Sequence, residues 1–334
     1  MRSVLVTGGA GFIGSHLVDQ LLEDGAAVRV LDNLASGSLG NLQAAAERHS
    51  RAGGTLNGSR LEVIIGDVRD RELLRTALRG VKYVFHLAAL PAGAAAITDT
   101  ADRHAVNVDG TLNVLHGALT EGVWRVVLAS CSSVYGSPDS IPVSEDAPMQ
   151  PTSLFAASKA AAETYCRAFH ARHRLDTVTL RYFSVYGPRQ KSDRGGSPVP
   201  HLIEALRKGR LLDEQYGRSL EDLTYVDDAV AATLAAARAP RAAGRAINIG
   251  SGQMVTIDEV RHMLADLLRV PVVPGFSQDL ESRPRSICAS TVLAAELLDF
   301  TPRVSLSQGL GRVVRWVTDG YVESSSLAPV GYDE

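Results

Sequence analysis

The chain has 334 residues, of which 45% are hydrophobic and 21% are charged. This balance is ordinary for a globular protein with a large core, so it excludes disorder as the main state. The formal net charge of −3 excludes a general binder of the nucleic-acid backbone, which needs a basic excess. The three cysteines exclude a disulfide scaffold, and neither they nor the nine histidines show the spacing of a metal site.

The sequence contains no run of about 18 apolar residues, so we expect no membrane-spanning helix. Residues 1–7 enter a strand pattern directly, without the charged and apolar regions of a secretory signal. We therefore expect a cytoplasmic protein that binds neither a membrane nor a nucleic acid. The length favours about two domains, or one large α/β unit with an appendage.

Short apolar runs alternate with helical patterns through the first half of the chain. We predict, in order, strand 4–7, helix 14–23, strand 27–31, strand 61–65, helix 72–78, strand 83–87, helix 107–120 and strand 125–129. Residues 51–59 hold three glycines and interrupt this rhythm, which indicates a surface loop. Continuous β-branched runs between helices are typical of a parallel sheet covered on both faces. The predicted fold is therefore an α/β, doubly wound sheet of the Rossmann type.

The second half begins with a predicted helix at 155–172 and a strand at 177–183. Glycines and prolines then gather from about residue 187 to residue 200, which indicates that the chain leaves the sheet for a smaller region. Beyond this point we predict one more strand and two helices, at 246–249, 256–268 and 291–298. The last residues, 322–334, form a polar tail.

Three glycines follow the first strand at the spacing Gly8, Gly11 and Gly14, and the first helix opens on them. Gly8 allows a tight turn, Gly11 lets the backbone approach a pyrophosphate, and Gly14 lets the helix pack close to the strand. The helix N-terminus offers N–H donors and a partial positive charge to the phosphates. This segment therefore predicts a dinucleotide cradle.

Asp32 ends the second strand, 18 residues after Gly14, and supports the same conclusion. A carboxylate at this place can accept both ribose hydroxyls of an adenosine, and it repels a 2′-phosphate. No arginine follows directly, so NAD is favoured over NADP as the cofactor. Asp67 follows the third strand and could bond the adenine amino group, or it could cap the next helix.

A set of motifs resembles the extended short-chain dehydrogenase/reductase family, and within it the nucleotide-sugar epimerases and dehydratases such as UDP-hexose 4-epimerases. The resemblance covers about residues 2–318. Its motifs in this chain are TGGAGFIG from Thr7, Asp32-Asn33, Gly66-Asp67-Val68, His86-Leu87-Ala88-Ala89, NVDGT from Asn107, SSVYG from Ser132, Ser158-Lys159 and RYFSVYGPRQ from Arg181.

The resemblance implies a firmly held NAD and a small-molecule substrate, a UDP- or dTDP-sugar. The residues that it assigns to the cofactor are Gly8, Gly11, Phe12, Ile13, Gly14, Asp32, Asn33, Ser36, Gly37, Asp67, Val68, Leu87, Ala88, Ala89, Asn107, Ser130, Lys159, Tyr182, Ser184 and Val185.

The family also implies a division of the chain into two domains. On this basis the NAD-binding domain comprises 1–184 and 224–252, and the substrate-binding domain comprises 185–223 and 253–321, with 322–334 as the tail. A homodimer is expected through two helices of each subunit, here 107–120 and 155–172.

The active site departs from the family pattern, which places Tyr-x-x-x-Lys on one helix. The matching residues are Phe155 and Lys159, and no other tyrosine of the chain has a lysine four residues later. A lysine and the cofactor's charge lower the pKa of the family's tyrosine, whose phenolate takes a hydroxyl proton while hydride passes to NAD. Phe155 has no proton to exchange.

Cys131 stands where the family has Ser or Thr, three residues before Val134. A thiol beside Lys159 and oxidised NAD could act as the base in place of the phenol, or Cys131 could be a small buried hydrophobic side chain. Ser132 is a candidate for both catalysis and substrate binding. Family dehydratases usually carry Asp-Glu before Val-Tyr-Gly, and Ser132-Ser133 here favour epimerisation over dehydration.

The substrate contacts that the resemblance implies are Ser132, Ser184, Arg189 and Arg283. Ser184 replaces a common Asn, Glu221 stands where an Arg usually faces the substrate diphosphate, and Ala95-Ala96 replace polar positions. An anion facing an anion is unfavourable when desolvated, unless the loop of Glu221 is shifted.

We therefore expect an NAD-dependent nucleotide-sugar epimerase that oxidises C4 of a hexose transiently and then reduces it again. The alternatives are a sugar-nucleotide dehydratase, a related enzyme acting on an atypical substrate, and a catalytically impaired or engineered NAD-binding variant. No metal is expected in the site.

Overall fold

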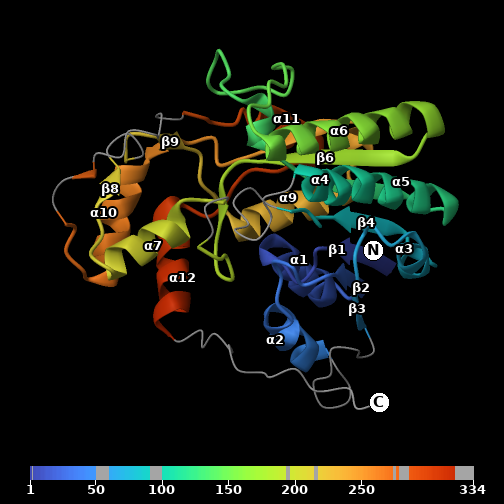
Figure 1. Ribbon diagram of the computed structural model, residues 1–334, viewed down its shortest axis with the longest axis horizontal. Helices are drawn as coiled ribbons and strands as arrows, with labels where there is room; N and C mark the ends of the chain where they lie inside the picture. Colours follow the sequence, from blue (N-terminus) through green and yellow to red (C-terminus); the bar gives the residue numbers. More distant parts are fainter. Residues whose placement is uncertain are drawn as a thin grey trace.

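Seven parallel strands form one central sheet (Figure 1). The computed structural model describes residues 1, 3–49, 60–90, 100–192, 196–213, 217–273, 276–277 and 286–319. The sheet order is β11-β6-β5-β4-β1-β2-β3. Its strands are β1 (Ser3–Thr7), β2 (Ala27–Asp32), β3 (Leu61–Ile65), β4 (Tyr83–His86), β5 (Arg125–Cys131), β6 (Asp176–Tyr182) and β11 (Ala246–Ile249).

The strand order reverses at β1, which pairs with β2 on one side and with β4 on the other. The two directions of winding diverge there, so the loops after β1 and β4 leave a crevice at the carboxyl edge of the sheet. Open α/β sheets bind their ligands at such a switch point.

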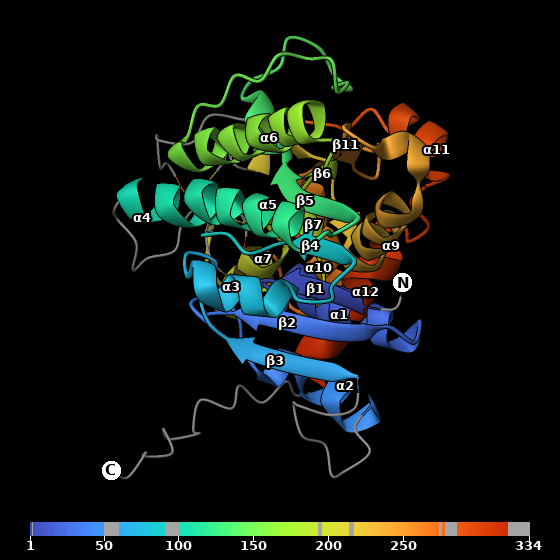
Figure 2. The ribbon, with the colours of Figure 1, turned by 90° about the vertical axis from the view of Figure 1, so that its right-hand side faces the viewer.

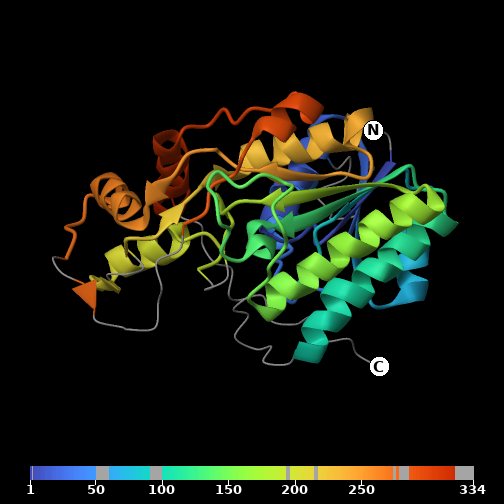
Figure 3. The ribbon, with the colours of Figure 1, turned by 90° about the horizontal axis from the view of Figure 1, so that it is seen from above.

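Helices cover both faces of the sheet (Figure 2). One layer contains α1 (Phe12–Glu23), α2 (Gly40–His49) and α9 (Val226–Arg238). In this layer α1 and α9 run beside each other. The other layer contains α3 (Arg71–Leu78), α5 (Gly110–Thr120) and α6 (Leu154–His173). Seen from above, α5 and α6 run side by side along the sheet (Figure 3).

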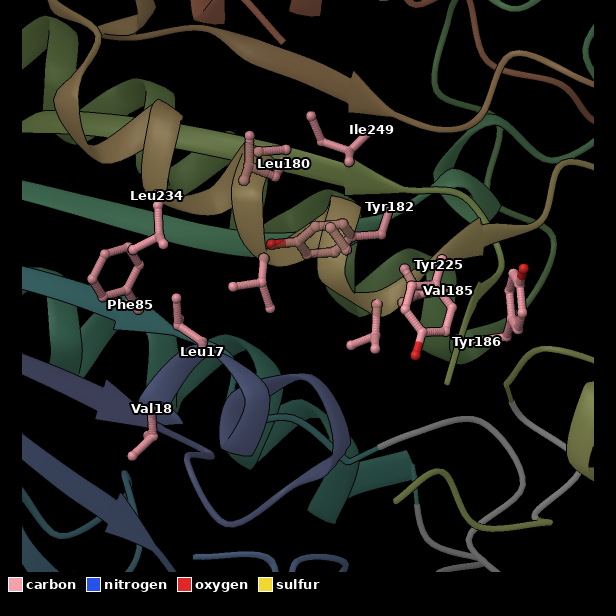
Figure 4. Close-up of a cluster of buried hydrophobic side chains, with 14 of the residues drawn as sticks. Leu17, Val18, Phe85, Leu180, Tyr182, Val185, Tyr186, Tyr225, Leu234 and Ile249 are labelled. Atoms are coloured by element: carbon pink, nitrogen blue, oxygen red, sulfur yellow. The ribbon is translucent and has the colours of Figure 1, made fainter. Parts of the chain in front are cut away.

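The two layers bury separate apolar clusters. In the layer of α1 and α9, Leu17 and Val18 pack with Phe85 of β4 and Leu234 of α9 (Figure 4). Burial of each such aliphatic or aromatic side chain stabilises the fold by about 1.5–3 kcal/mol. The same cluster reaches Tyr182, so the sheet and the carboxyl-edge crevice share one packed support.

A smaller group of elements lies beside the carboxyl edge of the sheet (Figure 1). Its helices are α7 (Val199–Arg207), α10 (Ile257–Leu268) and α12 (Leu306–Thr318), while α11 (Val292–Leu298) packs against β11. Its two-residue strands pair as β7 (Val185–Tyr186) with β10 (Thr224–Tyr225), β9 (Leu220–Glu221) with β12 (Val255–Thr256), and β8 (Leu212–Asp213) with β13 (Phe276–Ser277). The predicted division into two domains, with its boundaries, stays a prediction.

The strands and helices predicted from the sequence are confirmed, with ends that differ by at most two residues for every strand. The helix expected at 107–120 begins earlier, as α4 (Thr100–His104) followed by a π-helical turn, Ala105–Asp109, that runs into α5. The sequence analysis missed α2, α7, α9 and α12. The expected loop at 51–59 and the expected tail at 322–334 lie outside the described residues.

No helix in the described ranges is both long and apolar enough to cross a membrane. Over the same ranges no cluster of three or more His, Cys, Asp or Glu could hold a metal ion.

Candidate functional site

The segment from the end of β1 into the first turn of α1 has no room for side chains at Gly8 and Gly14. A Cβ on Gly8, whose φ is +71°, would lie 2.7 Å from the backbone nitrogen of Ala88. A Cβ on Gly14 would lie 2.1 Å from the carbonyl oxygen of Gly8. Gly11 is the N-cap of α1, and no side chain caps that helix end. The backbone N–H groups of the first turn are therefore available to an anion.

Asp32 holds this turn from the neighbouring strand. Its Oδ2 accepts a hydrogen bond from the Ala10 N–H at 2.9 Å, and its Oδ1 accepts one from the Leu34 N–H at 2.8 Å. Burial raises the pKa of Asp32, and the two backbone donors oppose that rise. Each carboxylate oxygen has a second lone pair, so Asp32 can accept ribose hydroxyls while it fixes the cradle.

A cavity of about 560 Å³ runs along the carboxyl edge of the sheet from Asp32 to Phe155. Most of the residues assigned to the cofactor line it. They are Gly8, Gly11, Phe12, Ile13, Gly14, Asp32, Asn33, Ser36, Val68, Leu87, Ala88, Ala89, Ser130, Lys159, Tyr182, Ser184 and Val185. Cys131, Ser132, Phe155 and Arg189, the other described candidates for catalysis and substrate binding, line it as well.

Three residues assigned to the cofactor are not among the lining residues: Gly37, Asp67 and Asn107. The carboxylate of Asp67 accepts hydrogen bonds from the Arg69 guanidinium at 2.9 Å and the Asn33 amide at 2.8 Å. Their roles at the cofactor therefore stay predictions. Arg283, the other predicted substrate contact, and Ala95-Ala96 lie outside the described residues.

The side chain of Asn107 joins three elements behind the cavity. Its Oδ1 accepts from the Leu90 N–H at 2.7 Å, and its Nδ2 donates to the Leu90 carbonyl at 3.2 Å and to Ser158 Oγ at 2.9 Å. Ser158 in turn donates to the Phe155 carbonyl at 2.7 Å. Asn107 thus positions the first turn of α6.

Helix α6 presents Phe155 and Lys159 to the cavity. Ser153 caps the helix by accepting from the Ala156 N–H at 3.1 Å, and the four-residue spacing puts Phe155 and Lys159 on one face. Lys159 is 5% exposed, and burial lowers its pKa. The described part of the chain supplies no hydrogen-bond partner for its ammonium group, which leaves its three donors to a ligand.

The tyrosine that lines the described part of the cavity does not replace the missing phenol. Tyr182 directs its hydroxyl to Thr233 Oγ1, 2.6 Å away on α9 (Figure 4). Burial raises the pKa of Tyr182, so the phenol stays protonated. Its ring forms part of the wall and its hydroxyl does not face the site.

Cys131 ends β5 beside Lys159 and Ser132. Its Sγ lies 2.7 Å from Ser133 Oγ. Burial raises the pKa of Cys131, and the Ser133 hydroxyl and Lys159 oppose that rise without cancelling it. At neutral pH the side chain is therefore a thiol, which donates or accepts a hydrogen bond but is a weak base.

Ser184 and Glu221 meet at the substrate end of the cavity. The Ser184 hydroxyl donates to Glu221 Oε2 at 2.5 Å, and Ser184 has a φ of +26°, which is rare for a residue with a side chain. The loop of Glu221 is thus not turned away from the position of Ser184. The sequence analysis singled out both residues, and the structure brings them together.

Arg189 lies on the α1 side of the cavity. Its Nη2 is 2.8 Å from Asp19 Oδ2, and the adjacent Pro188 carbonyl is 3.0 Å from His16 Nε2. Lys191 reaches the Ser36 carbonyl at 2.7 Å. Residues 188–191 therefore run from β7 across to the cofactor cradle. The sequence analysis missed these contacts with α1 and with Ser36, because they depend on how distant parts of the chain lie in space.

His86 supports the floor of the site and makes folding sensitive to pH. Its Nδ1 is 2.7 Å from Thr7 Oγ1 and its Nε2 is 2.9 Å from Thr111 Oγ1. Burial, with a smaller effect of Lys159, lowers the pKa of His86 to about 3 from 6.5. The unfolded chain takes up a proton below about pH 6.5 and the folded chain does not. The stabilisation by neutral His86 is complete above this pH and is lost as the pH falls toward 3.

Because of His86, we expect the free energy of unfolding to be about 2 kcal/mol lower at pH 5 than at pH 7. Urea unfolding of the wild type and of His86→Gln at both pH values measures this, because glutamine can still donate and accept hydrogen bonds but does not titrate. The variant should lose less stability than the wild type by that amount. Equal losses would contradict the assignment.

Asp32 should make the protein select NAD. We expect NADP to bind about 100-fold more weakly than NAD, because a 2′-phosphate next to this carboxylate costs about 2.7 kcal/mol. Calorimetric titration of the cofactor-free protein measures both affinities. Asp32→Ser should bring the ratio toward one, whereas Glu62→Gln, an exposed change on the neighbouring strand β3, should leave it unchanged. A ratio near one in the wild type would contradict this prediction.

Comparisons with known proteins agree with this geometry. The NAD dependent epimerase/dehydratase family matches residues 4–250. Over 317 residues the chain is 34% identical to a UDP-glucose 4-epimerase of Mycolicibacterium smegmatis, covering 93% of this chain and 97% of the relative.

Two solved structures are also similar. The UDP-glucose 4-epimerase of Thermotoga maritima, solved with UDP-glucose, superposes with a TM-score of 0.84 at 30% identity, covering 96% of this chain and 99% of that one. The dTDP-glucose 4,6-dehydratase DesIV of Streptomyces venezuelae, solved with NAD, superposes with a TM-score of 0.83 at 33% identity, covering 96% and 97%. The cradle without room for Cβ atoms fits the same cofactor, and so does the Lys159 ammonium, for which the described residues supply no hydrogen-bond partner. The chain is thus an NAD-dependent enzyme that belongs to the epimerase/dehydratase family.

Proposed function

We propose that the protein is a nucleotide-sugar 4-epimerase, which oxidises C4 of a hexose and reduces it again from the opposite face. The relative from M. smegmatis and the structure from T. maritima both carry the name UDP-glucose 4-epimerase, which supports this choice. The dehydratase DesIV is nearly as similar in structure, so the decision between the two reactions depends on the site itself.

The proposal depends on which acidic side chains line the substrate end of the cavity. Loss of water from a sugar requires an acid that protonates the departing hydroxyl. Among the described lining residues the one carboxylate is Asp32, at the ribose end. Ser132 and Ser133 line the substrate end, and hydroxyls there can bind a sugar without expelling one of its oxygens. This wall favours epimerisation.

NAD, when bound, accepts the hydride from the sugar carbon and returns it. Gly8, Gly11 and Gly14 would admit its pyrophosphate to the N-terminus of α1, and Asp32 would accept from its adenosine ribose. Lys159 would donate to the nicotinamide ribose with the ammonium group that has no partner in the described structure.

In the proposed reaction, the substrate end binds the sugar hydroxyl that is oxidised without the help of a tyrosine phenol. Cys131 and Ser132 can exchange hydrogen bonds with it, while the Phe155 ring covers the position where the family's phenol would stand. Since the Cys131 thiol is a weak base at neutral pH, we expect slow turnover. Ser184, Arg189 and Arg283 remain the proposed contacts of the substrate.

Mixing the NAD-loaded protein with UDP-glucose or dTDP-glucose tests the proposal. We expect transient absorbance of the reduced nicotinamide, followed by the C4 epimer in the product mixture. A 4-keto-6-deoxy product would instead identify a dehydratase. Cys131→Ser compares the thiol with a hydroxyl: unchanged turnover over the whole pH range would exclude a thiolate base.

A second candidate is a catalytically silent NAD-binding protein, favoured by Phe155 itself. It predicts bound NAD but no reduction with either sugar nucleotide. Homodimer formation through α5 and α6 and a cytoplasmic location stay predictions.

A further inference from the structure

A buried carboxylate and arginine lie directly behind the wall of the cavity. Glu163 of α6 and Arg181 of β6 are each 5% exposed. Arg181 donates to Glu163 Oε2 from Nη2 at 2.8 Å and from Nε at 3.0 Å. Glu163 Oε1 accepts a hydrogen bond from the hydroxyl of Ser130, which lines the cavity. Ser130 thus connects the cavity to a carboxylate that is absent from the described lining.

Glu163 lies on the face of α6 that also carries Phe155 and Lys159. Phe155, Lys159 and Glu163 stand four residues apart along α6, so their side chains leave the same face of the helix. Phe155 offers no proton acceptor and Lys159 is a cation. Glu163 is therefore the carboxylate that this face of α6 places nearest to Phe155 and Lys159.

Behind Glu163 lies a second cavity of about 160 Å³. Glu163 and Arg181 both line it, together with Glu145, Asp146 and Arg245. This polar space has room for several water molecules, which take about 30 Å³ each. The hydrogen bond between Ser130 and Glu163 therefore lies between the substrate cavity and a separate polar cavity.

We propose that Glu163, acting through Ser130, receives the proton that the sugar hydroxyl releases on oxidation. The proposal rests on the proposed function. As the sugar O–H bond breaks, its proton bonds to Ser130 Oγ, while the Ser130 O–H bond breaks and that proton bonds to Glu163 Oε1. The sugar C–H electron pair leaves as hydride, for which the family's NAD is the acceptor. Re-reduction reverses each transfer, and water in the second cavity exchanges with the stored proton.

The charges around Glu163 suit this role. Arg181 places two hydrogen bonds on Glu163 Oε2, which leaves Oε1 to Ser130, and it also donates to Tyr135 Oη at 2.8 Å and to the Glu145 carbonyl at 3.2 Å. The described titratable and charged groups that face Glu163 or its arginine are Lys159, Cys166, Cys131, Arg181, Tyr135 and Glu145, and Asp146, Arg167 and Arg245 line the same second cavity.

The test compares Ser130→Ala with Tyr135→Phe. Ser130→Ala breaks the path but keeps the ion pair of Glu163 and Arg181. Tyr135→Phe removes a hydroxyl from the same network and leaves the path intact. After the NAD-loaded protein is mixed with UDP-glucose, nicotinamide reduction in Ser130→Ala should be at least tenfold slower than in the wild type and should lose its pH dependence. Tyr135→Phe should keep both the rate and the pH profile, which separates a relay from a structural role.

A second measurement needs no turnover. Burial is the main cause that raises the pKa of the Cys131 thiol, and the charge of Glu163 adds a smaller rise. In the cofactor-free protein Glu163→Gln should therefore lower the pH midpoint of Cys131 alkylation, read by peptide mass spectrometry. Ser130→Ala, which keeps the charge, should leave that midpoint nearly unchanged. An unshifted midpoint in a folded Glu163→Gln overturns the proposal.

The kinetic outcomes separate the two proposals. If the wild type reduces no cofactor with any sugar nucleotide, the proposed function fails and the proton path fails with it. If the wild type reacts and Ser130→Ala matches its rate and pH dependence, only the proton path is overturned.

Discussion

Replacing Phe155 by tyrosine should raise the rate of nicotinamide reduction by about 100- to 1,000-fold, because a positioned acid–base group contributes this much to proton transfer. The new hydroxyl would stand one helical turn from Lys159, on the face of α6 that lines the cavity. The nearby ammonium would lower the pKa of the phenol and so favour the phenolate. Stopped-flow absorbance of NAD-loaded protein mixed with UDP-glucose measures the effect.

Phe155→Leu is the matched control, since it changes the size of the side chain without adding a proton acceptor. It should not exceed the wild-type rate. In Phe155→Tyr, Ser130→Ala should have a much smaller effect than in the wild-type background, because the phenol offers a second acceptor. A tyrosine variant no faster than the wild type would show that the site lacks more than the phenol, and would favour the silent NAD-binding protein.

The central sheet could be predicted because its strands are continuous apolar runs between helices. Helices bury most strands of the sheet on both faces, so their sequences need no alternation. The edge strand β3, where Glu62 and Ile65 are exposed, is less buried. Helix α9 was missed for the related reason that nearly all of its faces are buried, which removes the contrast between polar and apolar sides. In α12 the pattern is amphipathic, but Gly309 and Gly311 weaken its helical signal.

The cofactor half of the site was more predictable than the catalytic half. Gly8, Gly14 and Asp32 act through the turn that follows their own strands, so local sequence contains the geometry. Glu163 and Arg181 are different: they pair from a helix to a strand, and only the packing of α6 on β6 shows that their charges cancel. The contact between Ser184 and Glu221 likewise depends on how two short strands approach each other.

The second large effect concerns stability. Asp222 is 0% exposed, and its carboxylate accepts four hydrogen bonds shorter than 3.1 Å. The Ser251 N–H and hydroxyl donate to Oδ1, both at 2.6 Å, and the N–H groups of Gly252 and Ala289 donate to Oδ2, both at 3.0 Å. This one carboxylate therefore joins the loop after β11 and the returning chain at Ala289 to the end of β9.

Asp222→Asn should lower the free energy of unfolding by about 4 kcal/mol. An amide turns two acceptor lone pairs into donors that face the existing donors, and such a change in a buried charged network costs about 3–5 kcal/mol. Asp227→Asn is the control, because Asp227 pairs with Arg312 on the surface and its loss should cost less than about 1 kcal/mol. Urea unfolding at neutral pH measures both.

The same substitution also tests how the site is held. Asp222 directly follows Glu221, and β9 carries Glu221 to the hydroxyl of Ser184 at the substrate end of the cavity. If Asp222 fixes this contact, the variant should lose more affinity for the sugar nucleotide than for NAD, because the phosphate cradle on α1 does not depend on β9. Equal loss of both affinities would show that the fold as a whole had loosened. A stability loss below about 1 kcal/mol would contradict the role assigned to the carboxylate.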